Sequence, residues 1–417
     1  MFLCATLYRI KIPIYMKGKS NLDTDRKLPE GVADITESDC ALKNEIEASI
    51  ARALDSFGYN EIQTPTFEYL SVFSDDMAAE REDIIKFIDT SGRIMALRPD
   101  YTPSISRFTA LHKSEADLPL RLRYRGNIFR GGESFGARQK EFTQAGAELI
   151  GDPSPEADAE VICATIEALL QAGLSEFQLE LGHPGFLKGL IAGKLSEADF
   201  AALVGLLDKK AVPEIEDFCA EAGVDTELSE LLCRIPLLYG NAEIAEDMLG
   251  RGLGDECEAA LRNLLDVCYA VKDCGYERFI SVDLGLVRSF DYYTGVMFKG
   301  LTHNMAFPIC GGGRYDGLSG RFGGSFPATG TAIWPDRVMA AISRGSGRVE
   351  YPETDVLVWY NNNEERAAAH ALARDERQKG KRVICEKHDF RSDDEVCRYL
   401  SLHHILSASK AEKGGRQ

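Results

Sequence analysis

Two alternating segments joined by a glycine-rich stretch constrain the fold of this chain more than any other feature. The first, LRLRYRGNIF (residues 120–129), alternates leucine and tyrosine with arginine, and the second, EFTQAGAELIG (residues 141–151), also alternates. Successive strand residues point to opposite faces, so an alternation with period two predicts strands. Residues 120–150 are therefore predicted to form an antiparallel hairpin, with FRGGESFGARQK across its turn.

The second of these strands carries polar groups on one predicted face. Gln144 and Glu148 are four residues apart and point the same way, and Gly146 between them leaves room for a ligand. Arg130 ends the opposing strand. Burying the amide and the carboxylate would be costly without partners, so this face either holds a ligand or is exposed to solvent. The hairpin pattern alone leaves both alternatives open.

The rest of the chain divides by its periodicity. A helix is predicted from a cap at Ser38, and strands are predicted in YNEIQTPTFEYL, RIMALRP, EFQLELG, RFISVDLG and DYYTGVMFKG. Beyond Pro352 a β-α-β pattern indicates a small separate α/β domain. We therefore expect an α+β protein with an antiparallel sheet flanked by helices. The predicted parts are a flexible extension (1–27), a core in two pieces (28–184 and 277–345), a helical insertion (185–276) and the α/β domain (352–417).

Composition excludes some classes of protein. The 417 residues carry a net charge of −18, which gives no support for broad binding to nucleic-acid phosphates. Eleven cysteines without C-x-x-C spacing indicate reduced thiols in the cytoplasm and predict no zinc site. No apolar run approaches the ~20 residues that cross a bilayer. The opening MFLCATLYRIKIPIYM resembles a weak signal peptide, but a disordered extension, or Met16 as the true start, is the favoured interpretation.

Two further clusters carry candidate binding residues. LRPDYT places Asp100 and Thr102 at the end of a strand, and LVRSFDYYTG contains Arg288, Tyr292 and Tyr293. Because adjacent strand residues face opposite sides, at most one of the two tyrosines shares a face with Arg288. The alternative is a packed aromatic strand beside a surface arginine. Together the clusters offer partners for a carboxylate, an ammonium group and a ring nitrogen, which suits a free amino acid with a basic ring.

Other motifs do not indicate catalysis. CGGGRYDGL lacks the spacing of a phosphate-binding loop, and its glycines are expected to allow close approach between strands. His183 is expected after a strand, and His403 and His404 within the last strand. No catalytic triad or pair of acids is evident, so no catalytic residue, metal site or cofactor is predicted.

These motifs together resemble a known family. From about Leu28 to Arg344 the chain resembles the core of class II histidyl-tRNA synthetases and of their paralogue, the regulatory subunit of ATP phosphoribosyltransferase. SFGYNEIQTPTFEY is similar to the dimer-interface motif of the class, and YRGNIFRGGESFGARQKEFTQAGAELIG is similar to its second motif. LVRSFDYYTG and GGRYDGL resemble the two motifs specific for histidine. The resemblance implies a class II synthetase-like fold and a homodimer.

Departures from the synthetase pattern favour the regulatory paralogue. Arg130 is present, but Gly132 stands where the synthetases have a glutamate that engages ATP, a contact worth roughly 1.5–3 kcal/mol. In GTAIWPDR the inner glycine of the third class motif is replaced by Trp334, whose indole would fill space beside the adenine. Asp100 replaces a usual glutamate, and the last domain looks like a shortened anticodon-binding domain. These differences predict no amino-acid activation and no tRNA binding.

The resemblance implies a non-catalytic, cytoplasmic histidine sensor that works with a short-form catalytic ATP phosphoribosyltransferase subunit in the first step of histidine biosynthesis. Asp100 and Gln144 are expected to hold the ammonium group of histidine, and Glu148 and Tyr293 its imidazole. Its carboxylate is expected to meet Arg288 or Arg130. The rival hypotheses are an active histidyl-tRNA synthetase with an atypical ATP site and a histidine-binding paralogue with another partner. The complete set of implied histidine-binding residues is Asp100, Thr102, Arg130, Gln144, Glu148, Arg288, Tyr292 and Tyr293.

Overall fold

The predicted hairpin forms the centre of the main sheet. The computed structural model describes residues 27–73, 84–131, 139–286, 293–346 and 354–411. Within it, β5 (Leu120–Phe129) and β6 (Glu141–Ile150) pair antiparallel along their full length, from Leu120 opposite Ile150 to Phe129 opposite Glu141. The hairpin predicted from the alternation is confirmed.

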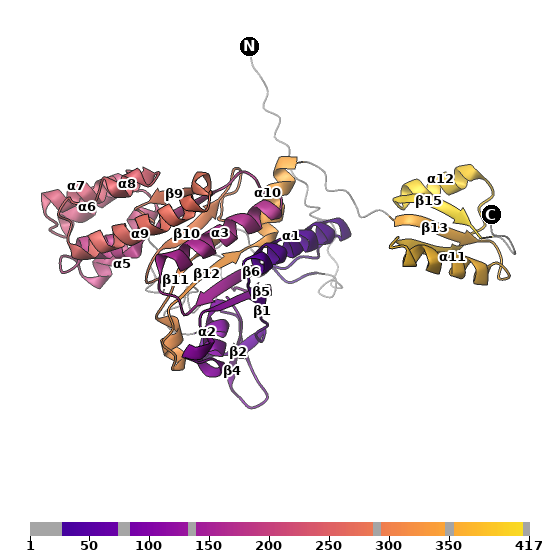
Figure 1. Ribbon diagram of the computed structural model, residues 1–417, viewed down its shortest axis with the longest axis horizontal. Coiled ribbons are helices and arrows are strands. Elements are labelled where there is room, and N and C mark those ends of the chain that lie inside the picture. The colour runs from indigo at the N-terminus through magenta and orange to yellow at the C-terminus, as the bar shows by residue number, and fades with distance from the viewer. Residues whose placement is uncertain (1–26, 74–83, 132–138, 287–292, 347–353, 412–417) are drawn as a thin grey trace, which may run out of the picture.

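Strands distant in the sequence complete this sheet on both sides of the hairpin (Figure 1). Two of its pairs, β1–β5 and β7–β9, are parallel, so the predicted antiparallel sheet flanked by helices is confirmed with a mixed character at these two pairs. In each parallel pair, the two strands are joined by a long connection that includes helices, as parallel pairing requires. In spatial order the strands are β1 (Asn60–Glu61), β5, β6, β12 (Ala328–Ile333), β11 (Cys310–Arg314), β10 (Met297–Leu301), β7 (Gln178–Gly182), β9 (Ile280–Asp283) and β8 (Tyr239–Gly240).

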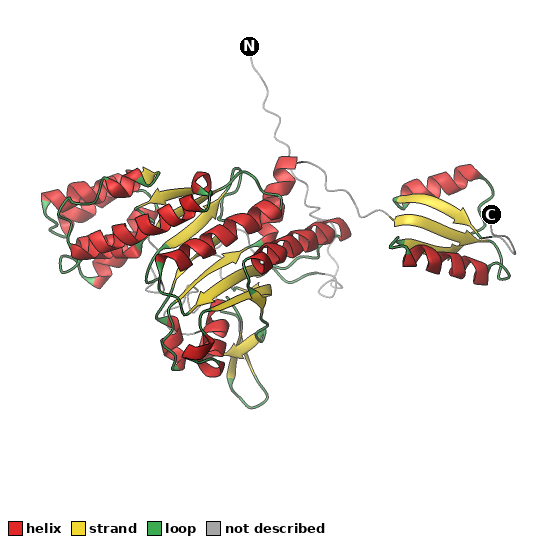
Figure 2. Ribbon diagram, in the orientation of Figure 1, coloured by secondary structure: helices red, strands yellow, loops and turns green. Residues whose placement is uncertain are grey.

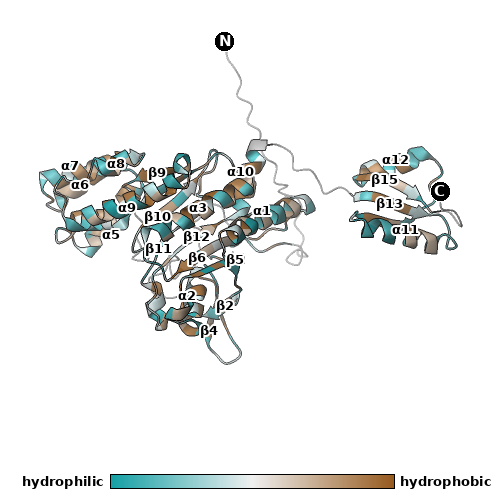
Figure 3. Ribbon diagram, in the orientation of Figure 1, coloured by the Kyte–Doolittle hydropathy of each residue, from teal (hydrophilic) through white to brown (hydrophobic). Residues whose placement is uncertain are grey.

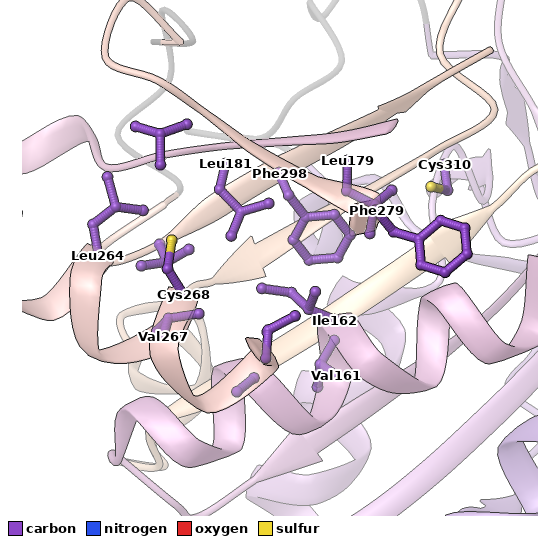
Figure 4. Packing of buried hydrophobic residues seen from close by; sticks show 14 of the residues in the cluster. Val161, Ile162, Leu179, Leu181, Leu264, Val267, Cys268, Phe279, Phe298 and Cys310 are labelled. Atoms are coloured by element: carbon purple, nitrogen blue, oxygen red, sulfur yellow. The ribbon is translucent and has the colours of Figure 1, made fainter. Parts of the chain in front are cut away.

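Long helices cover one face of the sheet, which we call the helical face (Figures 1 and 2). These helices are α1 (Glu37–Ser56), α3 (Pro155–Gln171) and α9 (Asp255–Asp273), with α10 (Pro335–Ser346) beside α1. They carry both hydrophilic and hydrophobic residues (Figure 3), as amphipathic surface helices do. Their apolar residues pack on those of the strands, and Figure 4 shows Ile162 of α3 and Val267 of α9 in one cluster with Leu181 and Phe298.

The ends of these helices follow local sequence signals. The Ser154 side chain accepts a hydrogen bond from the Ala157 amide at the start of α3, and Pro155 occupies the first turn, where its missing N–H costs nothing. Helix α1 is capped by Thr36 instead of Ser38, so that prediction was wrong by two residues. Thr36 and Ser38 are both good cap residues, and their hydroxyls lie within hydrogen-bond distance of each other.

The opposite face of the sheet, which we call the open face, carries smaller elements. Helix α2 (Thr102–His112) packs on the 3₁₀ turn Leu318–Phe322, and near it a second sheet has the order β2 (Phe67–Tyr69), β4 (Ile94–Leu97), β3 (Lys86–Ile88). Tyr101 and Tyr124 stack on this side with ring centroids 4.5 Å apart. A separate buried cluster fills the space between α2 and the sheet. Its fully or largely buried members are Tyr101, Ile105, Tyr124, Ile128, Phe142, Ile150, Tyr315, Leu318, Ala328 and Trp334.

Residues between β7 and β9 are mainly helical. The short strand β8 interrupts them and pairs with β9 at the edge of the main sheet, so the expectation of an all-helical stretch holds apart from these two residues. Buried residues of this region join the core of the helical face, Leu203 and Leu232 among them. The helices are α4 (Pro184–Ile191), α5 (Glu197–Asp208), α6 (Val212–Glu221), α7 (Thr226–Arg234), α8 (Glu243–Glu246) and α9.

Residues 354–411 form an α/β unit with its own two apolar clusters. Its three-stranded parallel sheet has the order β14 (Val383–Lys387), β13 (Thr354–Tyr360), β15 (Ile405–Lys410). Helices α11 (Arg366–Gln378) and α12 (Asp393–Leu402) complete the unit. His403 caps the C-terminus of α12 and His404 has a positive φ of 52°, so both precede the last strand and the prediction that they lie within it was wrong.

None of the helices in the described ranges is long and apolar enough to span a bilayer.

Candidate functional site

A strip of glycines makes room on the open face. Opposite residues of neighbouring strands share a face, and the register aligns Glu148 of β6 with Gly330 of β12 and with Gly313 of β11. A Cβ atom on Gly330 would lie 1.7 Å from Oε2 of Glu148, and one on Gly146 would lie 2.5 Å from the Tyr124 hydroxyl. Glycine is therefore required at both positions, and the strip leaves the backbone as the floor of a site.

Glu148 lies on this floor and is 1% exposed. The hydroxyl of Thr102, the first residue of α2, donates a hydrogen bond to its Oε1 at 2.7 Å, and the hydroxyl of Tyr315 donates to Oε2 at 2.5 Å. Both oxygens of the buried carboxyl group thus have a partner, as burial of a polar group demands. The alternative that this face is exposed to solvent is wrong.

Burial raises the pKa of Glu148 to about 8. The hydrogen bonds from Tyr315 and Thr102 act in the opposite direction, since they stabilise the carboxylate, and the nearby charge of Asp100 raises the pKa further. A carboxyl group with a pKa of about 8 holds its proton at neutral pH. A cationic ligand beside it would favour its ionised form.

Asp100 and Gln144 extend the polar group along the floor. Nε2 of Gln144 donates to Oδ1 of Asp100 at 3.5 Å, and the same oxygen lies 3.3 Å from the Thr102 hydroxyl. Gln144 is fully buried, and its Oε1 accepts from the Tyr101 amide. We call Asp100, Thr102, Gln144, Glu148 and Tyr315 the carboxylate cluster. It joins two acidic groups through one hydroxyl.

Arg130 lies at the edge of the carboxylate cluster. Its Nε donates to the carbonyl of Pro99 at 3.0 Å, and its Nη2 lies 3.5 Å from Oδ2 of Asp100. The guanidinium is buried and adds one positive charge beside the two acids. The structure therefore brings together Asp100, Thr102, Arg130, Gln144 and Glu148, five of the predicted residues.

Tyr293 belongs to the same face. A Cβ atom on Gly313 would lie 2.9 Å from Cδ1 of Tyr293, so the ring lies over the glycine aligned with Glu148. Two strand spacings, about 10 Å, separate the backbones of β6 and β11. The carboxyl group of Glu148 reaches over Gly330 on the strand between them, so the two side chains approach each other more closely than their backbones do. Arg288 and Tyr292 lie outside the described residues.

Tyr315 is a site residue that the sequence reasoning missed. It belongs to GGRYDGL, which resembles one of the two motifs specific for histidine, and the tyrosine of that motif was the signal that could have identified it. The preceding Arg314 points to the helical face, where its Nε donates to Oδ2 of Asp158 at 2.9 Å and its Nη2 donates to the carbonyl of Ser154. This buried ion pair fixes the end of β11 against α3. It therefore holds Tyr315 in place beside Glu148.

Trp334 lies next to the carboxylate cluster on the same face. Its indole is 6% exposed, and the guanidinium of Arg337 lies 4.5 Å from its ring centroid. Arg337 also donates to the carbonyl of Pro308 at 2.6 Å. The indole N–H has no hydrogen-bond partner among the described residues, a deficit that costs about 1–3 kcal/mol. Packing, not hydrogen bonding, holds this ring.

Beyond Trp334 is a pocket of about 390 Å³, which we call the aromatic pocket. The indole forms part of its wall. That it fills the space beside an adenine stays a prediction. Asp336, at its edge, is tied to Lys43 and to the Thr143 amide, both at 2.8 Å. The other main residues that line the aromatic pocket are Phe142, Met305, Phe307, Arg337 and Arg344.

The arrangement is suited to binding a small polar ligand. The carboxylate cluster offers acceptors for an ammonium group and for a ring N–H, and Arg130 offers a donor for a carboxylate. The carboxyl oxygens of Glu148 already accept from two hydroxyls, and no nucleophile with an adjacent base occurs among the described residues of the site. No group of three or more potential metal-ligating side chains occurs in the described part of the chain.

Comparison with known proteins agrees with this fold. Residues 31–338 match the family model described as histidyl-tRNA synthetase, which defines the class: a histidyl-tRNA synthetase-like protein of class II fold. The ATP phosphoribosyltransferase regulatory subunit of Acetivibrio thermocellus is 40% identical over 342 residues, covering 82% of each chain. That of Caldanaerobacter subterraneus is 39% identical over 376 residues, covering 88% of this chain and 98% of the relative.

A solved structure agrees in fold over almost the whole chain. The protein from Bacillus halodurans described as an ATP phosphoribosyltransferase regulatory subunit/histidyl-tRNA synthetase has a TM-score of 0.82 and 28% identity, covering 94% of this chain and 99% of that one. The chain belongs to the family of ATP phosphoribosyltransferase regulatory subunits.

Proposed function

We propose that this chain is the non-catalytic, histidine-binding regulatory subunit of a short-form ATP phosphoribosyltransferase in the cytoplasm. In this role it is required for the first step of histidine biosynthesis and carries its feedback regulation by histidine. The observation that carries the proposal is the buried carboxyl group of Glu148, held by Thr102 and Tyr315 and aligned with Tyr293 across a floor of glycines. The regulatory-subunit relatives support the same assignment.

In the proposed binding mode, each polar group of histidine has a partner in the site. Asp100 and Gln144 hold the ammonium group, while Glu148 and Tyr293 contact the imidazole nitrogens. Arg130, already near Asp100, or Arg288 neutralises the carboxylate. A ligand without the imidazole would lack the ring nitrogens that Glu148 and Tyr293 are proposed to contact, which supports a preference for histidine over other amino acids.

Calorimetry with histidine tests the site. The wild-type protein is expected to bind histidine, and Glu148→Ala to abolish binding while the protein remains folded by circular dichroism. Glu141→Ala is a matched control, because Glu141 lies at the start of the same strand and bonds to Asn127 away from the cluster. Unchanged affinity in Glu148→Ala would rule out the role given to this residue.

The catalytic partner and the oligomer belong to the same proposal. The regulatory role requires a hetero-oligomer, and histidine inhibits only if it binds one state of that assembly better than another. A homodimer through the synthetase-like core is supported by an exposed aromatic face on the small sheet. There Phe67 and Phe87, 5.6 Å apart, lie beside Tyr69, and these rings are 52%, 39% and 43% exposed.

An active histidyl-tRNA synthetase with an atypical ATP site is the rival function. The aromatic pocket favours it, because a cavity lined by Phe142 and Arg337 remains beside the indole. Against it stand Trp334 in the wall of this cavity and Gly132 in place of the glutamate, although Gly132 lies outside the described residues. Incubation with histidine, ATP and labelled pyrophosphate decides between the two. Histidine-dependent exchange at a synthetase-like rate would refute the regulatory proposal.

A histidine-binding paralogue with a different partner is distinguished by co-purification. The tagged chain is expected to retain a catalytic phosphoribosyltransferase subunit that lacks a regulatory domain of its own, and to restore its activity. If the chain binds histidine but neither retains the catalytic subunit nor restores its activity, the histidine-sensor role stands and the proposed partner is refuted. No binding to tRNA is expected in a filter assay.

A further inference from the structure

Trp334 stands across the floor of the site next to the carboxylate cluster. Extending the register of β12 with β6 by one residue places Trp334 opposite Gln144, on the face that holds Glu148. A Cβ atom on Gly311 would lie 3.8 Å from Cη2 of Trp334. The indole therefore reaches from the end of β12 across to β11 and covers the floor between them.

The indole separates two spaces on this face. The aromatic pocket is lined by Trp334, Phe142 and residues 304–307, and it includes no member of the carboxylate cluster. Trp334 is held from below by Gly311 and from the pocket side by Arg337, whose guanidinium also donates to the Pro308 carbonyl. Its amide donates to the carbonyl of Ile309 at 3.0 Å. A ring fixed at so many points is a rigid partition.

The following step rests on the proposed function, namely histidine as the ligand. Its ammonium group is assigned to Asp100 and Gln144, and Gln144 lies opposite Trp334. The ammonium and carboxyl groups of an amino acid share one carbon atom, so the carboxyl group lies near Gln144 as well. A carboxylate that meets Arg130 lies toward Phe142, whose ring centroid is 5.7 Å from that guanidinium and which lines the aromatic pocket together with the indole. Any substituent on the carboxyl group would extend toward the partition.

We propose that Trp334 determines specificity by admitting free histidine and excluding derivatives with a bulky extension at the carboxyl group, such as N-substituted amides, peptides and esters. The barrier is steric, and it stands between the carboxylate cluster and the aromatic pocket. A sensor with this barrier responds to the free amino acid and not to histidine already linked through its carboxyl group. Exclusion by a clash is a common means of discrimination between related ligands.

Two neutral amides isolate the steric effect. Histidinamide and N-benzyl-histidinamide lack the carboxylate charge equally and differ only in the group beyond the amide nitrogen. Titration calorimetry on the full-length protein is expected to give the benzyl amide at least about tenfold weaker binding than histidinamide. Trp334→Ala is expected to reduce this ratio to near one, with a smaller change in the affinity for histidine itself.

A second substitution and a control make the result independent of one variant. Trp334→Leu keeps an apolar side chain and is expected to give an intermediate ratio, so it tests the role of Trp334 even if Trp334→Ala does not fold. Trp359→Phe changes the chain's other tryptophan, which lies in the C-terminal α/β unit, and should leave the ratio unchanged. That variant also leaves Trp334 as the single indole, whose fluorescence should change on addition of histidine.

The outcomes separate this inference from the function on which it rests. Failure of all three ligands to bind would refute the proposed function and this inference with it. Binding of histidine together with equal affinities of the wild type for the two amides would refute only the inference. A ratio that persists in both Trp334→Ala and Trp334→Leu would place the barrier elsewhere and would also overturn it.

Discussion

The carboxylate cluster and the aromatic pocket lie on one face of one sheet, yet they are built on opposite principles. In the cluster, Glu148 is buried with a hydrogen bond to each oxygen, and Gln144 is buried with both ends of its amide bonded. In the pocket, the indole of Trp334 is buried, and its N–H has no hydrogen-bond partner in the part of the chain that the structure describes. Because buried polar groups are costly without partners, the first arrangement specifies a polar ligand closely. The second specifies only shape.

The largest loss of histidine binding is expected from a substitution in the glycine floor beneath Glu148. In Gly330→Ala the added Cβ would lie 1.7 Å from Oε2 of Glu148, so the carboxyl group must leave Tyr315 or the strands must separate. We expect histidine binding to fall by at least about 100-fold, together with about 1–3 kcal/mol of stability from overpacking. Calorimetry and urea unfolding measure the two effects.

Gly205→Ala is the matched control for this substitution. Gly205 lies in α5, and a Cβ atom there meets nothing within 4 Å. Alanine is the better helix former by about 0.5–1 kcal/mol, so this variant should be slightly more stable and bind histidine normally. Equal affinities of the two alanine variants would show that the glycine floor does not shape the site.

The protonation of Glu148 gives the second prediction, in the pH dependence of stability. The folded protein holds this proton up to a pKa of about 8, whereas the unfolded chain releases it near 4.5. Between these values the native state binds more protons than the unfolded state, so stability falls as the pH rises, by at most about 1.4 kcal/mol per pH unit. Glu148→Gln, which mimics the neutral acid, should lack this contribution.

Urea unfolding at pH 5.5, 6.5 and 7.5 measures the effect in both proteins. The free energy of unfolding of the wild type relative to Glu148→Gln is expected to decrease steadily across this series. Parallel pH profiles would mean that Glu148 is ionised in the empty site at neutral pH. The cluster would then hold a charge in the absence of ligand.

A smaller effect is expected from Tyr315→Phe. It removes one hydrogen bond to a buried carboxyl group, worth about 1–2 kcal/mol, and should weaken histidine binding about tenfold. The pKa of Glu148 should rise further, since this bond lowers it. Tyr124→Phe is the control. It also removes a tyrosine hydroxyl from the buried apolar cluster between α2 and the sheet, but the hydroxyl of Tyr124 donates to the carbonyl of Thr331 and not to Glu148. If both variants bind alike, Tyr315 does not position Glu148.

The sequence predicted the cluster better than the pocket for a physical reason. Strand alternation determines which residues share a face, so Gln144 and Glu148 could be placed together from their spacing alone. The contact of Tyr315 with Glu148 joins residues 167 positions apart, and no local period encodes it. The extent of the cavity beside Trp334 depends on how Arg337 and residues 304–307 pack, and the local sequence pattern does not reveal this packing.

Local competition explains the remaining errors. Thr36 and Ser38 are equally suitable helix caps, and β8 has two residues, too few to produce an alternating pattern. His403 and His404 stand next to the hydrophobic stretch of β15 but end α12 and the following turn. In each case tertiary contacts, not local propensity, determine where the element begins.

The smallest effect is expected on the far side of the indole. Arg344 lines the aromatic pocket, where its Nη1 donates to the carbonyl of Asn304, and its side chain is exposed. Since Trp334 stands between this arginine and the carboxylate cluster, Arg344→Ala should change histidine affinity less than about twofold and stability by less than about 0.5 kcal/mol. Additivity follows from the same separation, so the double variant with Tyr315→Phe should bind histidine as Tyr315→Phe alone does. A coupling energy above about 0.5 kcal/mol in that cycle would show that the two regions communicate through the indole, and the partition would then transmit strain as well as exclude ligands.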